Sequence, residues 1–220
     1  MNAREDEDGN RETAEDTDPG GTGGGGVRFR RFDPERDDPE ALRALHERAL
    51  RDAGTNPDDV PGTEDLERIP ETYLDGGEFI VGVVDDGVVK DGVIDDGTDA
   101  DGAGDDEAGD DRVVAMGGFR PASDLPPGGH EGFDPGAAAP ADAVELFRIA
   151  VAPEAQGRGL GAELLAELER RAAERGFSWV VLTTAARQRA GLELYRSRGY
   201  AEVGRLQQGA YELVRFEKSL

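Results

Sequence analysis

The sequence predicts an α/β fold in which helices flank a mixed β-sheet. Short runs rich in β-forming residues alternate with segments whose apolar residues recur every three or four positions. From residue 27 onward these segments follow the order β-α-α-β-β-β-α-β-α-β-β. A hydrophobic content of 36% and clear helical periodicity indicate a folded core, so we expect one compact domain over residues 27–220.

The first 26 residues are acidic and then rich in glycine. Such a segment cannot bury enough apolar surface to offset the entropy lost when the chain becomes ordered. We therefore expect a disordered tail at 1–26.

The N-terminal half of the domain combines amphipathic helices with an antiparallel strand pair. Leu42, Leu45 and Ala49 form one apolar stripe on the first helix. Pro70 should bend or break the second helix, because proline lacks a backbone N–H and clashes with the preceding turn. The predicted strands are 27–32, 78–84 and 112–119, the last two antiparallel, and the predicted helices are 37–53 and 63–74.

An acidic insertion at 85–111 separates the two antiparallel strands. Its alternating aspartates invite comparison with calcium-binding loops, which need a glutamate at the twelfth position. A loop that starts at Asp95 has Asp106 there, and one that starts at Asp96 has Glu107 but no flanking helices. We therefore expect a flexible acidic insertion and no metal site.

A buried strand, a glycine-rich loop and an amphipathic helix follow one another in the C-terminal half. The apolar run 143–151 ends before Pro153 and fits a strand buried on both faces. The helix at 159–175 has one apolar stripe and ends at Gly176. This stripe consists of Leu160, Leu164, Leu168 and Ala172. The next predicted elements are a strand at 178–184 and a helix at 187–198.

The loop from Gln156 to Ala162 is typical of phosphate sites, because a helix start offers unpaired N–H groups and a partial positive charge. It is not a Walker A loop, since it lacks the required lysine followed by serine or threonine. The dinucleotide pattern G-x-G-x-x-G/A is met by Gly157, Gly159 and Ala162. That pattern should directly follow its strand, however, and the next strand should end in an acidic residue, which is missing here.

The loop also fits Q/R-x-x-G-x-G/A, and here the chain resembles the GCN5-related N-acetyltransferase (GNAT) family, which binds acetyl-coenzyme A (acetyl-CoA). Segment 145–154 is similar to the family's central strand and turn, 191–200 to its A-x-x-L-Y-x-x-x-G-F/Y helix end, and 216–220 to its closing strand. The resemblance implies the GNAT fold, a mixed, mostly antiparallel sheet with splayed fourth and fifth strands. The family often has Asn and Ala where this chain has Gln188 and Gly191.

In that family, pantetheine inserts between the two splayed strands and contacts their unpaired backbone groups. The resemblance implies that the main-chain N–H and C=O groups of Ile149 and Val151 have this role. For the phosphates we expect backbone amides of the loop, with two side chains nearby. The candidate phosphate-binding residues are Gln156, Gly157, Arg158, Gly159 and Gly161.

Acetyl transfer from a thioester to an amine needs a base for the amine proton and benefits from an acid at the leaving thiolate. Glu145 is the candidate base, directly or through water, because strand alternation places it on one face with Phe147 and Ile149. Some family members have a catalytic glutamate at this place. Tyr195 is the candidate acid, since it projects one turn from Gly191, whose missing side chain leaves room for a sulfur. Solvent exposure or an ion pair for Glu145 and packing for Tyr195 are the structural alternatives.

We therefore expect an N-acetyltransferase that transfers an acetyl group from acetyl-CoA to a primary amine by direct attack in a ternary complex. The alternative is a non-catalytic acyl-CoA-binding or regulatory protein with the same fold. The acceptor would be a small-molecule or peptide amine, bound between the first helices and the loop at 121–140. The sequence identifies neither the acceptor nor the oligomeric state, and a homodimer is one of the alternatives.

The charge balance is strongly acidic, with 49 acidic and 25 basic residues and a net charge of −24. A folded chain of this composition resembles proteins of salt-loving organisms, and we expect a halophilic archaeal source. The sequence lacks a basic patch with interleaved aromatic residues, so no nucleic-acid partner is expected. We interpret His46 as a surface helix residue and His130 as a loop residue.

The absence of cysteine excludes disulfides, thiolate metal sites and a cysteine nucleophile. No apolar stretch approaches the ~20 residues that a membrane-spanning helix needs. We expect a cytoplasmic protein with no membrane partner.

Overall fold

A computed structural model of the chain describes residues 26–60, 62–84, 89–90, 93–94, 111–124 and 140–220. Its centre is a seven-stranded mixed sheet with the order β1-β2-β5-β6-β7-β9-β8. The strands of this sheet are β1 (Arg28–Arg31), β2 (Glu78–Val84), β5 (Arg112–Pro121), β6 (Ala143–Val151), β7 (Trp179–Ala185), β8 (Ala201–Gln208) and β9 (Tyr211–Ser219). The helices are α1 (Pro39–Asp52), α2 (Ile69–Tyr73), α3 (Leu160–Glu174) and α4 (Arg189–Ser197).

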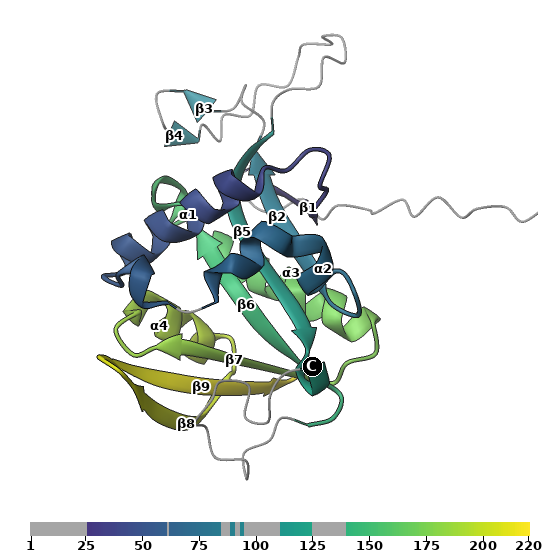
Figure 1. Ribbon diagram of the computed structural model, residues 1–220, viewed down its shortest axis with the longest axis vertical. Coiled ribbons are helices and arrows are strands. Elements are labelled where there is room, and N and C mark those ends of the chain that lie inside the picture. The colour runs from purple at the N-terminus through teal and green to yellow at the C-terminus, as the bar shows by residue number, and fades with distance from the viewer. Residues whose placement is uncertain (1–25, 61, 85–88, 91–92, 95–110, 125–139) are drawn as a thin grey trace, which may run out of the picture.

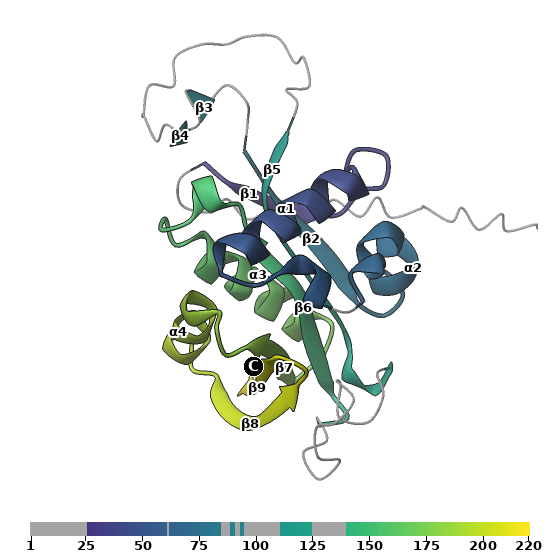
Figure 2. The same ribbon diagram turned by 60° about the vertical axis from the view of Figure 1, so that its left-hand side comes forward.

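Helices cover both faces of the sheet, with α1 and α2 on one face and α3 on the other (Figures 1 and 2). The predicted α/β fold with a mixed sheet is therefore confirmed. Within the predicted insertion, β3 (Val89–Lys90) pairs with β4 (Val93–Ile94) as a separate antiparallel sheet. The tail at 1–25 and the calcium-like stretch at 95–107 lie outside the described residues, as does His130.

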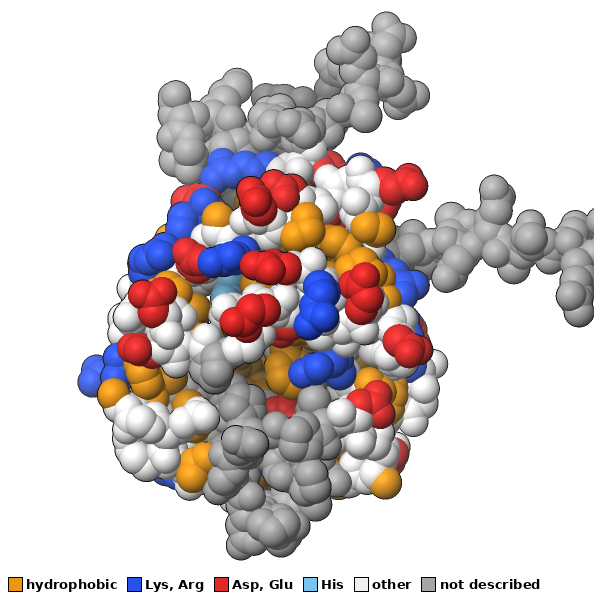
Figure 3. Space-filling model, in the orientation of Figure 1, with side chains coloured by type: hydrophobic (Ala, Val, Ile, Leu, Met, Phe, Trp, Pro, Cys, Tyr) orange, Lys and Arg blue, Asp and Glu red, His pale blue; other side chains and the backbone are white. Residues whose placement is uncertain are grey.

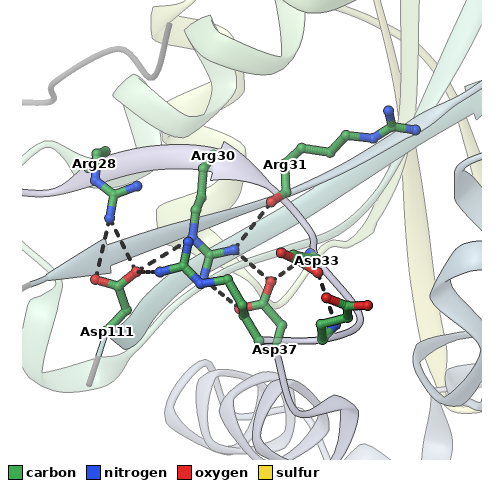
Figure 4. A network of polar contacts seen from close by, with 8 residues as sticks. Arg28, Arg30, Arg31, Asp33, Asp37 and Asp111 are labelled. Atoms are coloured by element: carbon green, nitrogen blue, oxygen red, sulfur yellow. Dashed lines mark hydrogen bonds and ion pairs between the residues drawn. The ribbon is translucent and has the colours of Figure 1, made fainter. Parts of the chain in front are cut away.

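The first helix begins later than predicted because two aspartates before it have other partners. Asp38 is the N-cap, and its side chain accepts a hydrogen bond from the amide of Glu40. Asp37 is buried, and both of its carboxylate oxygens accept hydrogen bonds from the Arg30 guanidinium at 2.7 Å (Figure 4). This pair raises the pKa of Arg30, chiefly through the hydrogen bonds to Asp37. Arg30 thus ties β1 to the turn that precedes α1.

The same network reaches the beginning of β5. Asp111 accepts hydrogen bonds from Arg28 at 3.2 Å and from Arg36 at 2.9 Å (Figure 4). Residues distant in sequence are thereby joined at one end of the sheet.

The predicted break in the second helix is confirmed. Residues Thr63–Arg68 form a 3-10 helix, and α2 begins at Ile69 with Pro70 in its first turn. Proline is tolerated there because the first helical N–H groups have no partner inside the helix.

Helix α3 follows the predicted bounds within one residue at each end. Gly159 is its N-cap with a φ of 85°, and Gly176 follows it with a φ of 88°. Both values lie in the left-handed region that favours glycine. The predicted apolar stripe is buried and belongs to the hydrophobic core.

Strands β6 and β7 form the parallel pair of the sheet, but they pair over only part of their length. The register joins Ala143–Leu146 to Trp179–Leu182, while β6 continues to Val151 and β7 to Ala185. Figure 1 shows the two strands diverging beyond this point. The prediction that the fourth and fifth strands of the main sheet splay apart is thus confirmed.

A β-bulge lies in β6 at the point of divergence. Met116 of β5 pairs with Ala150 and Gly118 with Phe147, so two residues of β6 face Gly117. Arg148, inside the bulge, has a φ of 55°, an uncommon value for a residue with a side chain. The bulge changes which side chains share a face of β6.

Candidate active site

An open cavity of about 1090 Å³ lies along the diverging ends of β6 and β7. Its other walls come from α1, the segment between α1 and α2, α4 and the β8–β9 turn. On the face shown in Figure 3, hydrophobic side chains near the centre lie between acidic and basic ones. Strand β6 contributes Leu146, Phe147, Arg148 and Ile149 to the lining, β7 contributes Leu182, Thr183, Thr184 and Ala185, and β5 contributes Arg120.

Arg148 crosses from the bulge to the segment that precedes α2. Its Nε lies 3.0 Å from both carboxylate oxygens of Asp65, and its Nη2 donates to the Gly62 carbonyl at 2.6 Å. The Tyr73 hydroxyl also donates to Asp65, at 2.5 Å. Burial and the Asp65 carboxylate raise the pKa of Tyr73 well above its ordinary value. These contacts fix one wall of the cavity.

His46 corrects a prediction, because it is not a surface residue. Its side chain is 6% exposed and lines the cavity. Burial, and then the positive charge of Arg148, lower the pKa of His46 to about 4, so the imidazole is neutral near pH 7. Its Nδ1 is buried and has no hydrogen-bond partner in the part of the chain that the structure describes. His46 continues the stripe of Leu42, Leu45 and Ala49, a spacing that could have revealed its burial.

Tyr195, the predicted acid, lines the cavity from α4. It is 7% exposed, and its ring packs against Tyr200 and Phe216 at centroid distances of 5.9 and 5.7 Å. Burial raises the pKa of the Tyr195 hydroxyl to about 12. No hydrogen bond joins this hydroxyl to another residue in the described part of the chain. A protonated donor therefore faces the cavity at neutral pH.

Glu145, the predicted base, is 1% exposed and does not line the cavity. It lies in the paired part of β6, between Arg120 of β5 and Val181 of β7 in the strand register. The structure thus places Tyr195 in the cavity and Glu145 behind its wall.

The expected alternation along β6 is wrong beyond Phe147, because the bulge interrupts it. Phe147 packs against Tyr73 of α2, with ring centroids 6.3 Å apart. A Cβ atom built on Gly117 would lie 2.8 Å from Ile149 Cδ1 and 3.1 Å from Leu168 of α3. Ile149 therefore faces α3, on the side of the sheet opposite to Phe147.

The glycine-rich loop lies beyond the cavity, between the end of β6 and α4. A Cβ atom on Gly161 would lie 3.3 Å from Leu194 and 4.0 Å from Val151. Gly157 and Gly159 have φ values of 76° and 85°, and a Cβ on either would meet no atom within 4 Å. This open space in front of a left-handed backbone suits the approach of a ligand.

Several loop groups have the positions expected of a phosphate site. Ala162 and Glu163 donate to the Gly159 carbonyl, whereas the amides of Gly159, Leu160 and Gly161 make no backbone hydrogen bond in the described part of the chain. The Gln156 side chain instead donates to the Val151 carbonyl at 3.1 Å, and Arg158 is exposed. The backbone is thus better placed for an anion than the Gln156 amide.

No group of three or more potential metal ligands occurs among the described residues. None of the helices in the described ranges is long and apolar enough to cross a membrane.

Comparisons with known proteins agree with this architecture. The model of the acetyltransferase (GNAT) family matches residues 101–200. No curated protein matches the chain. An acetyltransferase structure from Streptococcus agalactiae is similar with a TM-score of 0.61 and 13% identity, over 89% of this chain and 99% of the other.

Two further structures are similar over nearly the same region. A ribosomal-protein-alanine N-acetyltransferase from Brucella melitensis has a TM-score of 0.55 and 25% identity, over 87% of this chain and 99% of its own. The GNAT domain of a protein named PAT from S. lividans has a TM-score of 0.58 and 20% identity, over 88% and 90% of the two chains. The chain therefore has the GNAT fold, and residues 101–200 carry the sequence pattern of that acetyltransferase family.

Proposed function

We propose that the protein is an acetyl-CoA-dependent N-acetyltransferase that acts on a primary amine. The observation that carries this proposal is the partial pairing of β6 and β7, which opens the sheet between the cavity and the glycine-rich loop. The match of residues 101–200 to an acetyltransferase family supports it. A small-molecule amine and a peptide N-terminus both stay among the acceptors, because one similar structure is an N-acetyltransferase of a ribosomal protein alanine.

The described residues fit acetyl-CoA at each end of this opening. The amides of Gly159, Leu160 and Gly161, at the positive end of α3, would bind the diphosphate. The main-chain groups of Ile149 and Val151, in the stretch of β6 that β7 does not pair with, would bind the pantetheine arm.

Bound acetyl-CoA would supply the acetyl group as a thioester. The acceptor nitrogen forms a bond to the thioester carbon, and the carbon–sulfur bond breaks. The proton lost by the amine passes to Glu145 through water, and the Tyr195 hydroxyl gives a proton to the departing thiolate. The pKa of about 12 keeps Tyr195 protonated until the sulfur takes the proton. The products are an N-acetylated amine and the free thiol, and transfer of the proton from Glu145 to the Tyr195 oxygen through water restores both side chains.

A non-catalytic acyl-CoA-binding protein is the second candidate. It is favoured by one observation, namely that Glu145 does not line the cavity. An enzyme would need water to connect this carboxylate to the amine, whereas a binding protein would need no such connection.

Two measurements on the full chain separate these candidates. Titration calorimetry with acetyl-CoA tests binding, and release of free thiol in the presence of an amine panel tests transfer. Binding with amine-dependent thiol release supports the enzyme, and binding without it for any amine supports the binding protein. Absence of acetyl-CoA binding contradicts both.

We also propose a halophilic archaeal source. The net charge of −24, carried by a chain with the well-formed core described above, supports this proposal. In molar salt the screening length falls to about 3 Å, so repulsion among surface carboxylates would be largely removed.

A further inference from the structure

Arg120 is a cation in the lining of the cavity. It extends from β5 over two aromatic rings, with its guanidinium carbon 4.4 Å from the Phe147 centroid and 5.6 Å from that of Tyr73. It lines the cavity and makes no ion pair with any described residue. Its Nε is buried and has no hydrogen-bond partner among the described residues. Stacking on aromatic rings orients the guanidinium but leaves its hydrogen-bond donors unused.

Two neighbouring charged residues of the cavity wall, by contrast, form an ion pair with each other. Arg148 is neutralised by Asp65, and Asp65 also accepts the Tyr73 hydroxyl. The innermost carboxylate is therefore already engaged by two protein donors and is poorly placed to bind a cationic acceptor. Arg120 makes no ion pair with a described residue, although the chain has 49 acidic residues against 25 basic ones. Glu64, Glu71 and Asp124 also line the cavity, but they are exposed, whereas Arg120 is half-buried on two aromatic rings. An anion held beside these rings would therefore have Arg120 as its partner.

Two other residues of the cavity lining, His46 and Thr55, have buried polar atoms. His46 Nδ1 and Thr55 Oγ1 make no hydrogen bond to a described residue, and both residues line the same cavity as Arg120. Buried polar atoms are rarely left unpaired in folded proteins. A polar ligand bound in this cavity would supply hydrogen-bond partners for these atoms and for Arg120.

We propose that Arg120 binds an oxyanion of the acceptor, either a carboxylate or a phosphate, so that the acceptor is an amine that also carries an acidic group. This inference rests on the proposed acetyl transfer. Phe147, on which Arg120 stacks, directly precedes the bulge where β6 leaves β7. The acidic group would thus be held beside the opening through which the thioester enters. A short acceptor, such as an amino acid, meets this requirement.

The test compares matched acceptors that differ only in charge. Initial rates of thiol release are measured with glycine, β-alanine and glutamate, each against its carboxamide, and with glucosamine 6-phosphate against glucosamine. The unmodified protein should have a higher rate with the acidic acceptor than with its uncharged counterpart in at least one pair. A preference among the amino acids identifies a carboxylate as the bound oxyanion, and a preference for glucosamine 6-phosphate identifies a phosphate.

In Arg120→Gln, KM for the preferred acid should rise about 10- to 100-fold, as expected for a lost charge-assisted hydrogen bond, with kcat much less affected. KM for the uncharged counterpart should stay within about twofold. Arg120→Lys should recover part of the preference. Arg189→Gln is the matched control, because Arg189 is exposed at the start of α4 and does not line the cavity.

Thermal unfolding of each variant shows whether the fold is retained. Equal KM values within every pair, or an equal rise for charged and uncharged acceptors in Arg120→Gln, would overturn the inference while leaving acetyl transfer intact. Calorimetric titration of the same acids into the protein in the absence of acetyl-CoA measures anion binding without acetyl transfer. Binding that is lost in Arg120→Gln supports the inference even where acetyl transfer fails. No binding, together with no preference for acids, overturns it.

Discussion

Arg148 and Asp65 form a two-oxygen ion pair that joins the bulge of β6 to the segment before α2, with Arg148 Nε 3.0 Å from both carboxylate oxygens. Both side chains are nearly buried, at 11% and 13% exposure. The pair holds the first helices against the strand whose divergence opens the sheet. The geometry of the cavity therefore depends on a contact between residues far apart in the sequence.

Asp65→Asn should lower the free energy of unfolding by about 3 kcal/mol, because it leaves a nearly buried guanidinium without its counter-charge. Urea denaturation measures the change. The control is Glu64→Gln, which removes an exposed carboxylate from the same 3-10 helix and should stay within about 0.5 kcal/mol. An equal decrease in the free energy of unfolding in the two variants would contradict a stabilising role of the Arg148–Asp65 ion pair.

Gly159→Val should abolish acetyl-CoA binding in calorimetry while the protein stays folded. A valine at a φ of 85° is strained by roughly 2 kcal/mol, and its side chain would enter the space in front of the loop. Gly176→Val is the matched control, since Gly176 has a φ of 88° and equally open surroundings at the other end of α3. Both variants should lose similar stability, but only the first should lose the ligand. Removing the Arg158 side chain should weaken binding less, and unchanged affinity in Gly159→Val would remove the loop from the site.

Tyr195→Phe should lower turnover more than acetyl-CoA affinity, because the hydroxyl is needed only when the thiolate leaves. A loss of about 100- to 10,000-fold in kcat is typical of a missing general acid. With a pKa of about 12, the Tyr195 acid should cause no loss of rate below pH 10. Tyr200→Phe is the control, because Tyr200 packs on Tyr195 without lining the cavity. Equal kcat in the protein and in Tyr195→Phe would exclude the acid role.

His46 should make the protein sensitive to mild acid. Its pKa is about 4 when folded and 6.5 in a model peptide, so protonation favours the unfolded chain. Above pH 6.5 His46 is neutral in both states, and the free energy of unfolding is unaffected by its titration. As the pH falls from 6.5 toward 4, the unfolded chain takes up the proton and the free energy of unfolding decreases by roughly 3 kcal/mol. His46→Gln cannot titrate and should lose less stability between pH 7.5 and 4 in urea denaturation. Parallel pH profiles would contradict the burial of a neutral His46.

Salt should stabilise the protein if its acidity is an adaptation to a salt-rich environment. Raising KCl from 0.1 to 2 M shortens the screening length from about 10 Å to less than 3 Å and weakens repulsion among exposed carboxylates. Thermal unfolding should shift to higher temperature by several degrees. A constant or falling midpoint would argue against the halophilic source.

Much of the fold was predictable because its signals are local. The leucine stripe of α3 and the glycines at its two ends determine that helix within one residue. Pro70 likewise marks the change from a 3-10 helix to α2. The opening between β6 and β7 was expected only from the family resemblance, because no local sequence pattern predicts where the pairing of two strands ends.

The cavity was less predictable, because it depends on tertiary contacts. Alternation along β6 placed Glu145, Phe147 and Ile149 on one face, but the bulge at Arg148 arises from pairing with β5 and reverses the later side chains. His46 carried a readable signal in its helical spacing, whereas Arg120 carried none. Its position over the rings of Phe147 and Tyr73 exists only when β5, β6 and α2 come together.

The most direct measurement is a crystal structure of the full chain grown with excess acetyl-CoA. We expect the diphosphate on the amides of Gly159, Leu160 and Gly161, and the pantetheine arm along β6 from Phe147 to Val151, with the acetyl group facing Tyr195. A structure in which acetyl-CoA binds elsewhere, or in which the opening between β6 and β7 stays empty at saturating concentration, would contradict the proposed function.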